Sequence, residues 1–143
     1  MNDLEKAKSR LHEKGLTLII VKNDVVLFET DSHRISGFLG AIEQFGVKFS
    51  GASVADRVVG KAIALLCVYA GIREVYAEVM SRKAQAVLEK NRIKCQWKEL
   101  VDTILDLNRN DVCPFEKAAA PISKPEAAYS TFKALLKSFK PRR

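Results

Sequence analysis

Two short segments of the sequence carry most of the side chains that could do chemistry. The first runs from Gly51 to Ala62 (GASVADRVVGKA), and the second is Cys113-Pro114-Phe115-Glu116. Each has the pattern of a helix start, because Ser53 and Asp56 have the spacing of a capping box and Pro114 suits a first helical turn. Unpaired backbone N–H groups at a helix start favour anions, so the two segments predict a site for a small, anionic ligand.

Four side chains are candidates for catalysis, and each has a structural alternative. Asp56 could act as a general acid or base or only cap its helix, and Lys61 could bind negative charge or belong to a solvated stripe. Cys113 could be a nucleophilic thiolate or a small buried apolar residue, and Glu116 could polarise the site or serve the helix dipole. Ser53 joins them as a ligand-binding residue. We expect the four catalytic candidates, Asp56, Lys61, Cys113 and Glu116, to converge on one concave site, where helices follow the carboxyl ends of strands.

Several familiar motifs are missing from the sequence. Neither of the common phosphate-binding loops, G-x-x-x-x-G-K-[ST] and G-x-G-x-x-G, is present. The two histidines, His12 and His33, stand outside any H-x-E or H-x-x-x-H pattern, and we expect both to be solvated surface residues. The three cysteines form no C-x-x-C pair, which indicates free thiols in a reducing compartment. Because no histidine or cysteine lies near Asp56, we predict no bound metal and no cofactor, although Asp56, Cys113 and Glu116 could still offer a mixed site of oxygen and sulfur ligands.

The pattern around these segments predicts alternating strands and helices. Strands are expected at 16–21, 25–29, 75–80 and 93–97, and helices at 3–14, 35–45, 53–69, 81–91, from 113, and 123–139. The expected helix at 53–69 is apolar nearly all round and should be central. Strand, helix and strand over 75–97 imply parallel pairing. The prediction is an α/β fold in three layers, with helices on both faces of a mixed sheet of four or five strands.

Composition limits the classes of function. The chain has 143 residues, 48% of them apolar, which is enough for the core of one domain. It has no apolar run of the length that crosses a bilayer and no secretory signal, so we expect a cytoplasmic protein without a membrane partner. The net charge is +7, but residues 117–143 hold seven Lys or Arg against one acid. The nearly neutral remainder does not favour a nucleic-acid partner.

The basic tail is predicted to be a separate element. We divide the chain into a main domain, 1–121, and an appended amphipathic helix, 122–143, which begins after Ser123. The apolar stripe of this helix has three uses that the sequence leaves open. It can dock on its own domain, pack in a homodimer interface, or lie on an anionic membrane or nucleic acid.

The two segments, together with Val75-Tyr76-Ala77-Glu78, resemble a prokaryotic family of unknown function that is assigned to the cytidine-deaminase-like fold. The resemblance covers about residues 4–120. Zinc deaminases place H-x-E or C-x-E at one helix start and P-C-x-x-C at the next. Here Asp56 has no neighbouring His or Cys of that motif, Cys113 matches the first cysteine, and Glu116 stands in place of the second.

The resemblance therefore implies a deaminase-like domain without the usual zinc-ligand set. Such a domain would bind a small ligand and act on it through Asp56, Lys61, Cys113 and Glu116. The alternative is a non-catalytic binding or regulatory module that kept the scaffold and lost the chemistry. Fold alone does not choose between the two.

Overall fold

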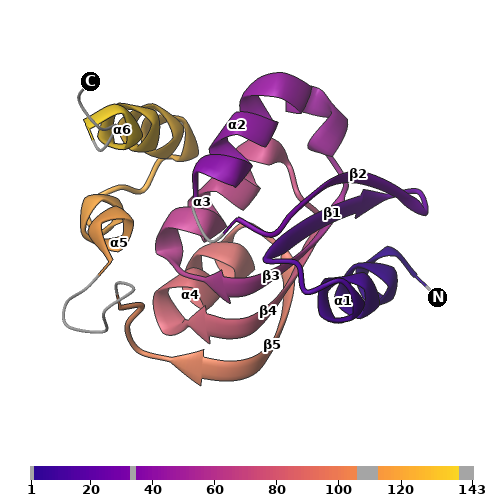
Figure 1. Ribbon diagram of the computed structural model, residues 1–143. Coiled ribbons are helices and arrows are strands. Elements are labelled where there is room, and N and C mark those ends of the chain that lie inside the picture. The colour runs from indigo at the N-terminus through magenta and orange to yellow at the C-terminus, as the bar shows by residue number, and fades with distance from the viewer. Residues whose placement is uncertain (1, 33–34, 106–112, 139–143) are drawn as a thin grey trace.

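The computed structural model describes residues 2–32, 35–105 and 113–138, and five strands there form one mixed sheet (Figure 1). In chain order they are β1 (Leu18–Lys22), β2 (Val25–Thr30), β3 (Ser53–Val59), β4 (Glu74–Ser81) and β5 (Lys94–Val101). The spatial order is β2-β1-β3-β4-β5, with β1 antiparallel to both of its neighbours and β3, β4 and β5 parallel. Asn23 and Asp24, both at positive φ, make the tight turn between β1 and β2.

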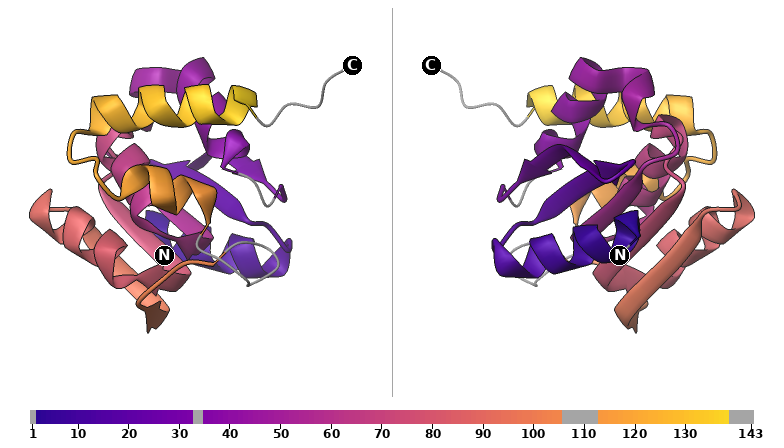
Figure 2. Two further views of the ribbon diagram at one scale, coloured as in Figure 1. Left: turned by 90° about the vertical axis from the view of Figure 1, so that its left-hand side faces the viewer. Right: turned by 90° about the vertical axis from the view of Figure 1, so that its right-hand side faces the viewer.

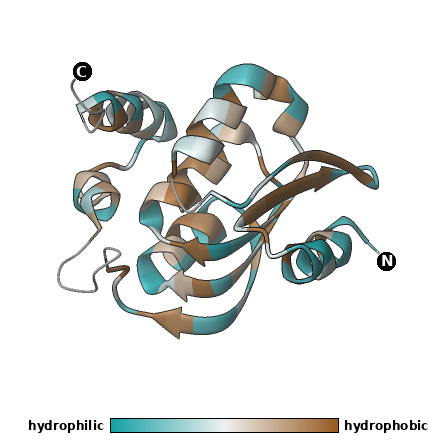
Figure 3. Ribbon diagram, viewed as in Figure 1, coloured by the Kyte–Doolittle hydropathy of each residue, from teal (hydrophilic) through white to brown (hydrophobic). Residues whose placement is uncertain are grey.

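Helices cover both faces of this sheet (Figures 1 and 2). One face carries α1 (Asp3–Glu13), a largely hydrophilic helix in Figure 3 that buries a short apolar stripe against β1, β3 and β4. The other face carries α2 (Ser36–Phe45), the 3-10 turn η1 (Gly46–Phe49), α3 (Lys61–Ala70) and α4 (Arg82–Lys90). The predicted α/β fold, in three layers around a mixed sheet, is confirmed, and the sheet has five strands. No helix among the described residues is long and apolar enough to cross a membrane.

Two consecutive crossover units place the starts of α3 and α4 at the same edge of the sheet. The chain runs from β3 through α3 to β4, and from β4 through α4 to β5. Because the three strands are parallel, their carboxyl ends meet at one edge, and each following helix begins there. This edge is where ligands bind in open parallel sheets.

The predicted helix over 53–69 is wrong in its first half, because residues 53–59 form β3 and the helix begins only at Lys61. Val54 packs into the core under α3, whereas the next residue, Ala55, packs under α1. A strand buried on both faces shows no alternation of polar and apolar residues, so its pattern cannot be told from a buried helix. Gly60 separates the strand from the helix.

Two further helices lie outside α3: α5 (Pro114–Ala119) and α6 (Pro125–Ser138). Within α6, Ala128 and Phe132 are fully buried in the same core as α2 and α3. Tyr129 stacks on Tyr69 of α3, with 4.6 Å between ring centroids. Ala128 and Phe132 are thus buried against the chain's own domain, and Tyr129 and Leu136 pack beside them half-buried. Phe139 lies outside the described residues, and the division of the chain at residue 121 stays a prediction.

Candidate functional site

The two sequence segments meet at the start of α3. Glu116, in α5, directs its carboxylate to the first backbone N–H groups of that helix: Lys61 N–H donates to Oε1 and Ala62 N–H to Oε2, each at 2.8 Å. These N–H groups have no partner within a helix, and a negative charge complements this end of the helix dipole. Glu116 is therefore the cap of α3, supplied from 55 residues further along the chain.

The Lys61 side chain makes a second contact between the same two helices, this time from α3 to the end of α5. Its Nζ donates to the carbonyl oxygen of Ala120, the C-cap of α5, at 2.8 Å, where a cation complements the helix dipole. Burial lowers the pKa of Lys61 and the charge of Lys83 lowers it further, while the carboxylate of Glu116 raises it. Lys61 and Glu116 together fasten α3 and α5 to each other.

Gly60 leaves the space that the Glu116 carboxylate occupies. Its φ of −99° is open to every residue, so backbone conformation does not require glycine here. A Cβ added at Gly60 would lie 2.3 Å from Oε1 of Glu116, which is far inside the contact distance. The predicted helix over 53–69 would place Gly60 in its interior, which is wrong: Gly60 is the N-cap of α3, and its small size admits the carboxylate.

We expect Glu116→Ala to lower the free energy of unfolding by about 2 kcal/mol, because two charge-assisted hydrogen bonds to backbone N–H groups are lost. Gly60→Ala should cost a similar amount, since the new methyl group displaces the carboxylate. In the Glu116→Ala protein, Gly60→Ala should cost no more than about 1 kcal/mol, the difference between Gly and Ala at an N-cap. Urea denaturation of the four proteins measures this coupling. If the two losses of unfolding free energy were additive, the small size of Gly60 would not be needed for the Glu116 carboxylate to cap α3.

Asp56 lies in β3, and its cross-strand neighbours Leu18 and Ala77 belong to the core beneath α3. It is therefore not a helix cap, as its spacing from Ser53 had predicted. Its Oδ1 accepts the N–H of Val58 at 3.2 Å. Burial raises the pKa of Asp56 to about 7, although backbone N–H groups and the charge of the neighbouring Arg57 lower it. A carboxyl group that titrates near neutral pH is suited to proton transfer.

Ser53 and Cys113 stand apart from the contact between α3 and α5. Ser53 is the first of the seven residues of β3, at the opposite end from Gly60, and its buried hydroxyl donates to the carboxylate of Glu74. Cys113 is half-buried at the N-cap of α5, and its N–H donates to the carbonyl of Ile104 at 3.1 Å. Cys113 is thus linked to the contact between α3 and α5 because it begins α5, and Ser53 lies outside that contact.

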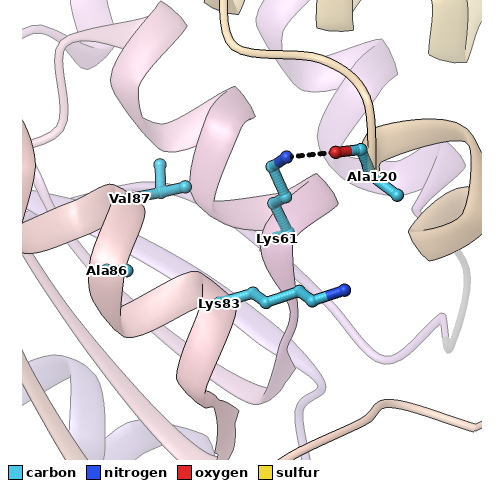
Figure 4. A pocket seen from close by; sticks show the side chains of 5 residues that line it. All are labelled: Lys61, Lys83, Ala86, Val87 and Ala120. Atoms are coloured by element: carbon cyan, nitrogen blue, oxygen red, sulfur yellow. Dashed lines mark hydrogen bonds between the residues drawn. The ribbon is translucent and has the colours of Figure 1, made fainter.

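A shallow pocket of about 310 Å³ lies beside the contact between Lys61 and Ala120 (Figure 4). Its lining consists of Lys61, Lys83, Ala86, Val87 and Ala120. Lys61 is the first residue of α3 and Lys83 the second of α4, so both amines belong to helix starts at the carboxyl edge of the parallel strands. Sequence reasoning missed Lys83. The signal that could have found it is Ser81, which caps the start of α4 directly after a parallel strand.

No group of three His, Cys, Asp or Glu side chains within the described ranges is placed to hold a metal ion. His12 lies on the α1 side of the sheet, where its Nε2 is 2.8 Å from the carboxylate of Glu78 and its Nδ1 is 2.8 Å from the carbonyl of Lys8. His33 lies outside the described residues. The absence of zinc therefore stays a prediction.

The fold and the site define a class: an α/β domain with a mixed five-stranded sheet and a lysine-lined pocket where two helices follow parallel strands. A family model described as a domain of unknown function (DUF1893, TM1506) matches residues 6–136. The chain belongs to this DUF1893 family, which confirms the family recognised from the two sequence segments.

Two solved structures are similar to this chain. A DUF1893 family protein (TM1506) from Thermotoga maritima is similar with a TM-score of 0.83 and 22% sequence identity, over 96% of this chain and 90% of that one, and it has the same fold. A dCMP deaminase from the cyanophage S-TIM5, in its apo form, is similar with a TM-score of 0.48 and 14% identity, over 69% of this chain and 94% of that one. This second similarity is weak and carries no argument about the site. No curated protein matches the sequence.

Proposed function

We propose that this protein is a small-molecule-binding domain whose ligand is an anion held in the pocket between α3 and α4. The observation that carries the proposal is the pair of amines, Lys61 and Lys83, on one pocket whose other lining residues are uncharged. Two cations on a wall without a carboxylate create a positive potential that attracts negatively charged ligands. The carboxylate of Glu116 is engaged by the backbone of α3 and caps that helix.

The place of the pocket supports the same function. Both lysines stand at the carboxyl edge of β3 and β4, which is the usual edge for ligands in parallel sheets. The pocket volume of about 310 Å³ is at the lower end of the range for small-molecule sites. A small metabolite is therefore favoured over a macromolecule.

A thermal-shift screen with small metabolites tests this function. We expect anionic compounds to raise the melting temperature of the wild-type protein, because a ligand that binds only the folded state stabilises it by mass action. The same compounds should stabilise Lys83→Gln less. Lys90→Gln, at the other end of α4, is the matched control and should respond like the wild type. Equal responses of all three proteins would contradict the proposal.

Catalysis is a second candidate, favoured by the pKa of about 7 that burial gives Asp56. Shifted titrations of this size are common among catalytic acids and bases. Asp56 would move a proton, and Lys61 would hold the charge of the ligand. Cys113, at the start of α5, would be the nucleophile, and Glu116 would hold the start of α3 in place. A ligand from the screen can be followed by NMR for chemical change, which Asp56→Asn should abolish while binding is kept. A ligand that binds unchanged would favour the non-catalytic binding or regulatory module.

Location and assembly complete the proposal. The three cysteines are all free, which supports a reducing compartment such as the cytoplasm. Because Ala128 and Phe132 of α6 are buried in the core of its own domain, that helix is better explained as part of a single folded chain than as a homodimer interface or a membrane or nucleic-acid contact.

A further inference from the structure

The pocket between α3 and α4 has hydrogen-bond donors to spare. An ammonium group carries three N–H donors, and Lys61 uses one of them on the carbonyl of Ala120 at 2.8 Å. Lys83 makes no hydrogen bond or ion pair with any described residue, and its side chain extends from α4 below that of Lys61 in the view of Figure 4. Both amines therefore keep donors for a ligand.

The charge of the pocket favours a dianion over a monoanion. The two amines repel each other, and the charge of Lys83 adds to the burial that lowers the pKa of Lys61. The charge of Glu116 also reaches Lys61, but its carboxylate is held by the first N–H groups of α3. A monoanion can pair with only one of the two amines, whereas a dianion pairs with both and removes their repulsion. A phosphate monoester carries a charge of about −1.5 to −2 at pH 7 and three acceptor oxygens, and lysine binds such a group as a point charge.

The remaining lining points to the rest of the ligand. Ala86 and Val87, on α4, and Ala120, after α5, contribute no polar side-chain atom, and the carbonyl of Ala120 already accepts the Lys61 amine. Such a wall suits a short carbon body and gives no side-chain hydrogen-bond partner to a sugar or a base. We infer that the ligand is a small phosphate monoester, with its phosphate between Lys61 and Lys83 and its carbon body against the aliphatic wall. This inference rests on the proposed anion-binding function and narrows it.

Methyl phosphate and dimethyl phosphate separate charge from shape. The second pKa of a phosphate monoester is about 6, so methyl phosphate is a dianion at pH 8. Dimethyl phosphate is a monoanion of similar size, like the diesters of nucleic acids and phospholipids. In NMR titrations of the 15N-labelled protein at matched ionic strength, we expect methyl phosphate to bind at least tenfold more tightly. It should shift the amide signals around Lys61, Lys83 and Ala120, and its affinity should fall as the pH is lowered through about 6.

Two variants locate the effect. Lys83→Gln should weaken the binding of methyl phosphate about tenfold, the equivalent of about 1.4 kcal/mol. It should leave the fold intact, since Lys83 is exposed and unbonded to described residues. Lys90→Gln removes one charge from the exposed end of the same helix and should leave the affinity unchanged. Equal weakening by both variants would show a general effect of net charge and overturn the inference.

The outcomes also separate this inference from the function on which it rests. If dimethyl phosphate or acetate shifted the same signals as strongly as methyl phosphate, the phosphate-monoester inference would fall and the anion site would stand. If none of these anions shifted signals around Lys61 and Lys83, the phosphate-monoester inference and the proposed anion-binding function would both be wrong.

Discussion

Asp56→Asn is expected to raise the free energy of unfolding at pH 8 by up to about 4 kcal/mol. Burial moves the pKa of Asp56 from 3.8 to about 7, and each unit is worth about 1.4 kcal/mol. Because the pKa is raised in the folded state, the stability that Asp56 contributes is complete below about pH 4 and is lost as the pH rises through about 7. Asparagine keeps an acceptor for the N–H of Val58 and never carries the buried charge.

Urea denaturation of the wild type and of Asp56→Asn between pH 4 and pH 9 measures this effect. The difference between the two proteins is the quantity to follow, because other carboxyl groups have their own pH dependence. Glu78 is an example: burial raises its pKa, but hydrogen bonds and charge from Arg57 and His12 outweigh this and lower it. The stability from Glu78 is therefore lost as the pH falls, which is the opposite sign.

The result bears directly on catalysis. A stabilising Asp56→Asn would mean that the native protein tolerates a costly buried carboxylate at neutral pH, as functional sites often do. Asp31→Asn, which removes an exposed carboxylate, controls for the change in net charge. Parallel pH profiles of the wild type and Asp56→Asn would show that Asp56 is not a buried charge. The catalytic candidate would then lose its support.

Phe132→Ala should lower the free energy of unfolding by about 3–5 kcal/mol, the usual cost of removing a buried aromatic ring. Phe132 has no exposed surface and lies in the core shared by α2, α3 and α6. Its ring meets that of Phe115 in α5 edge-on, with 6.0 Å between centroids. Loss of this side chain therefore loosens α6 from the layer that also holds Glu116.

Thermal or urea unfolding together with size-exclusion chromatography tests this prediction. Lys137→Ala, on the exposed side of α6, is the control and should change stability by less than about 0.5 kcal/mol. A small loss of stability for Phe132→Ala, accompanied by a change from dimer to monomer, would show instead that α6 packs between two copies of the chain.

Short-range patterns in the sequence determined several elements of this fold. Asn23 and Asp24 make the hairpin turn at positive φ, Gly46 ends α2, and Ser81 begins α4 with its hydroxyl accepting the N–H of Ala84 at 3.1 Å. Each of these signals depends on residues within four positions of one another. Such signals act through local backbone geometry and hydrogen bonding, so they can be read without knowing the rest of the structure.

Only the tertiary structure decided the site. The spacing of Ser53 and Asp56 fits a capping box, yet burial of both faces made this stretch β3 and moved the helix start to Lys61. The cap of α3 is Glu116, which no local pattern links to Gly60. The segments were recognised from their residue types, but which backbone groups they bind depends on how α5 packs against α3. The pKa of Asp56 likewise follows from burial of its carboxyl group in a strand that pairs with Leu18 and Ala77, both distant in sequence.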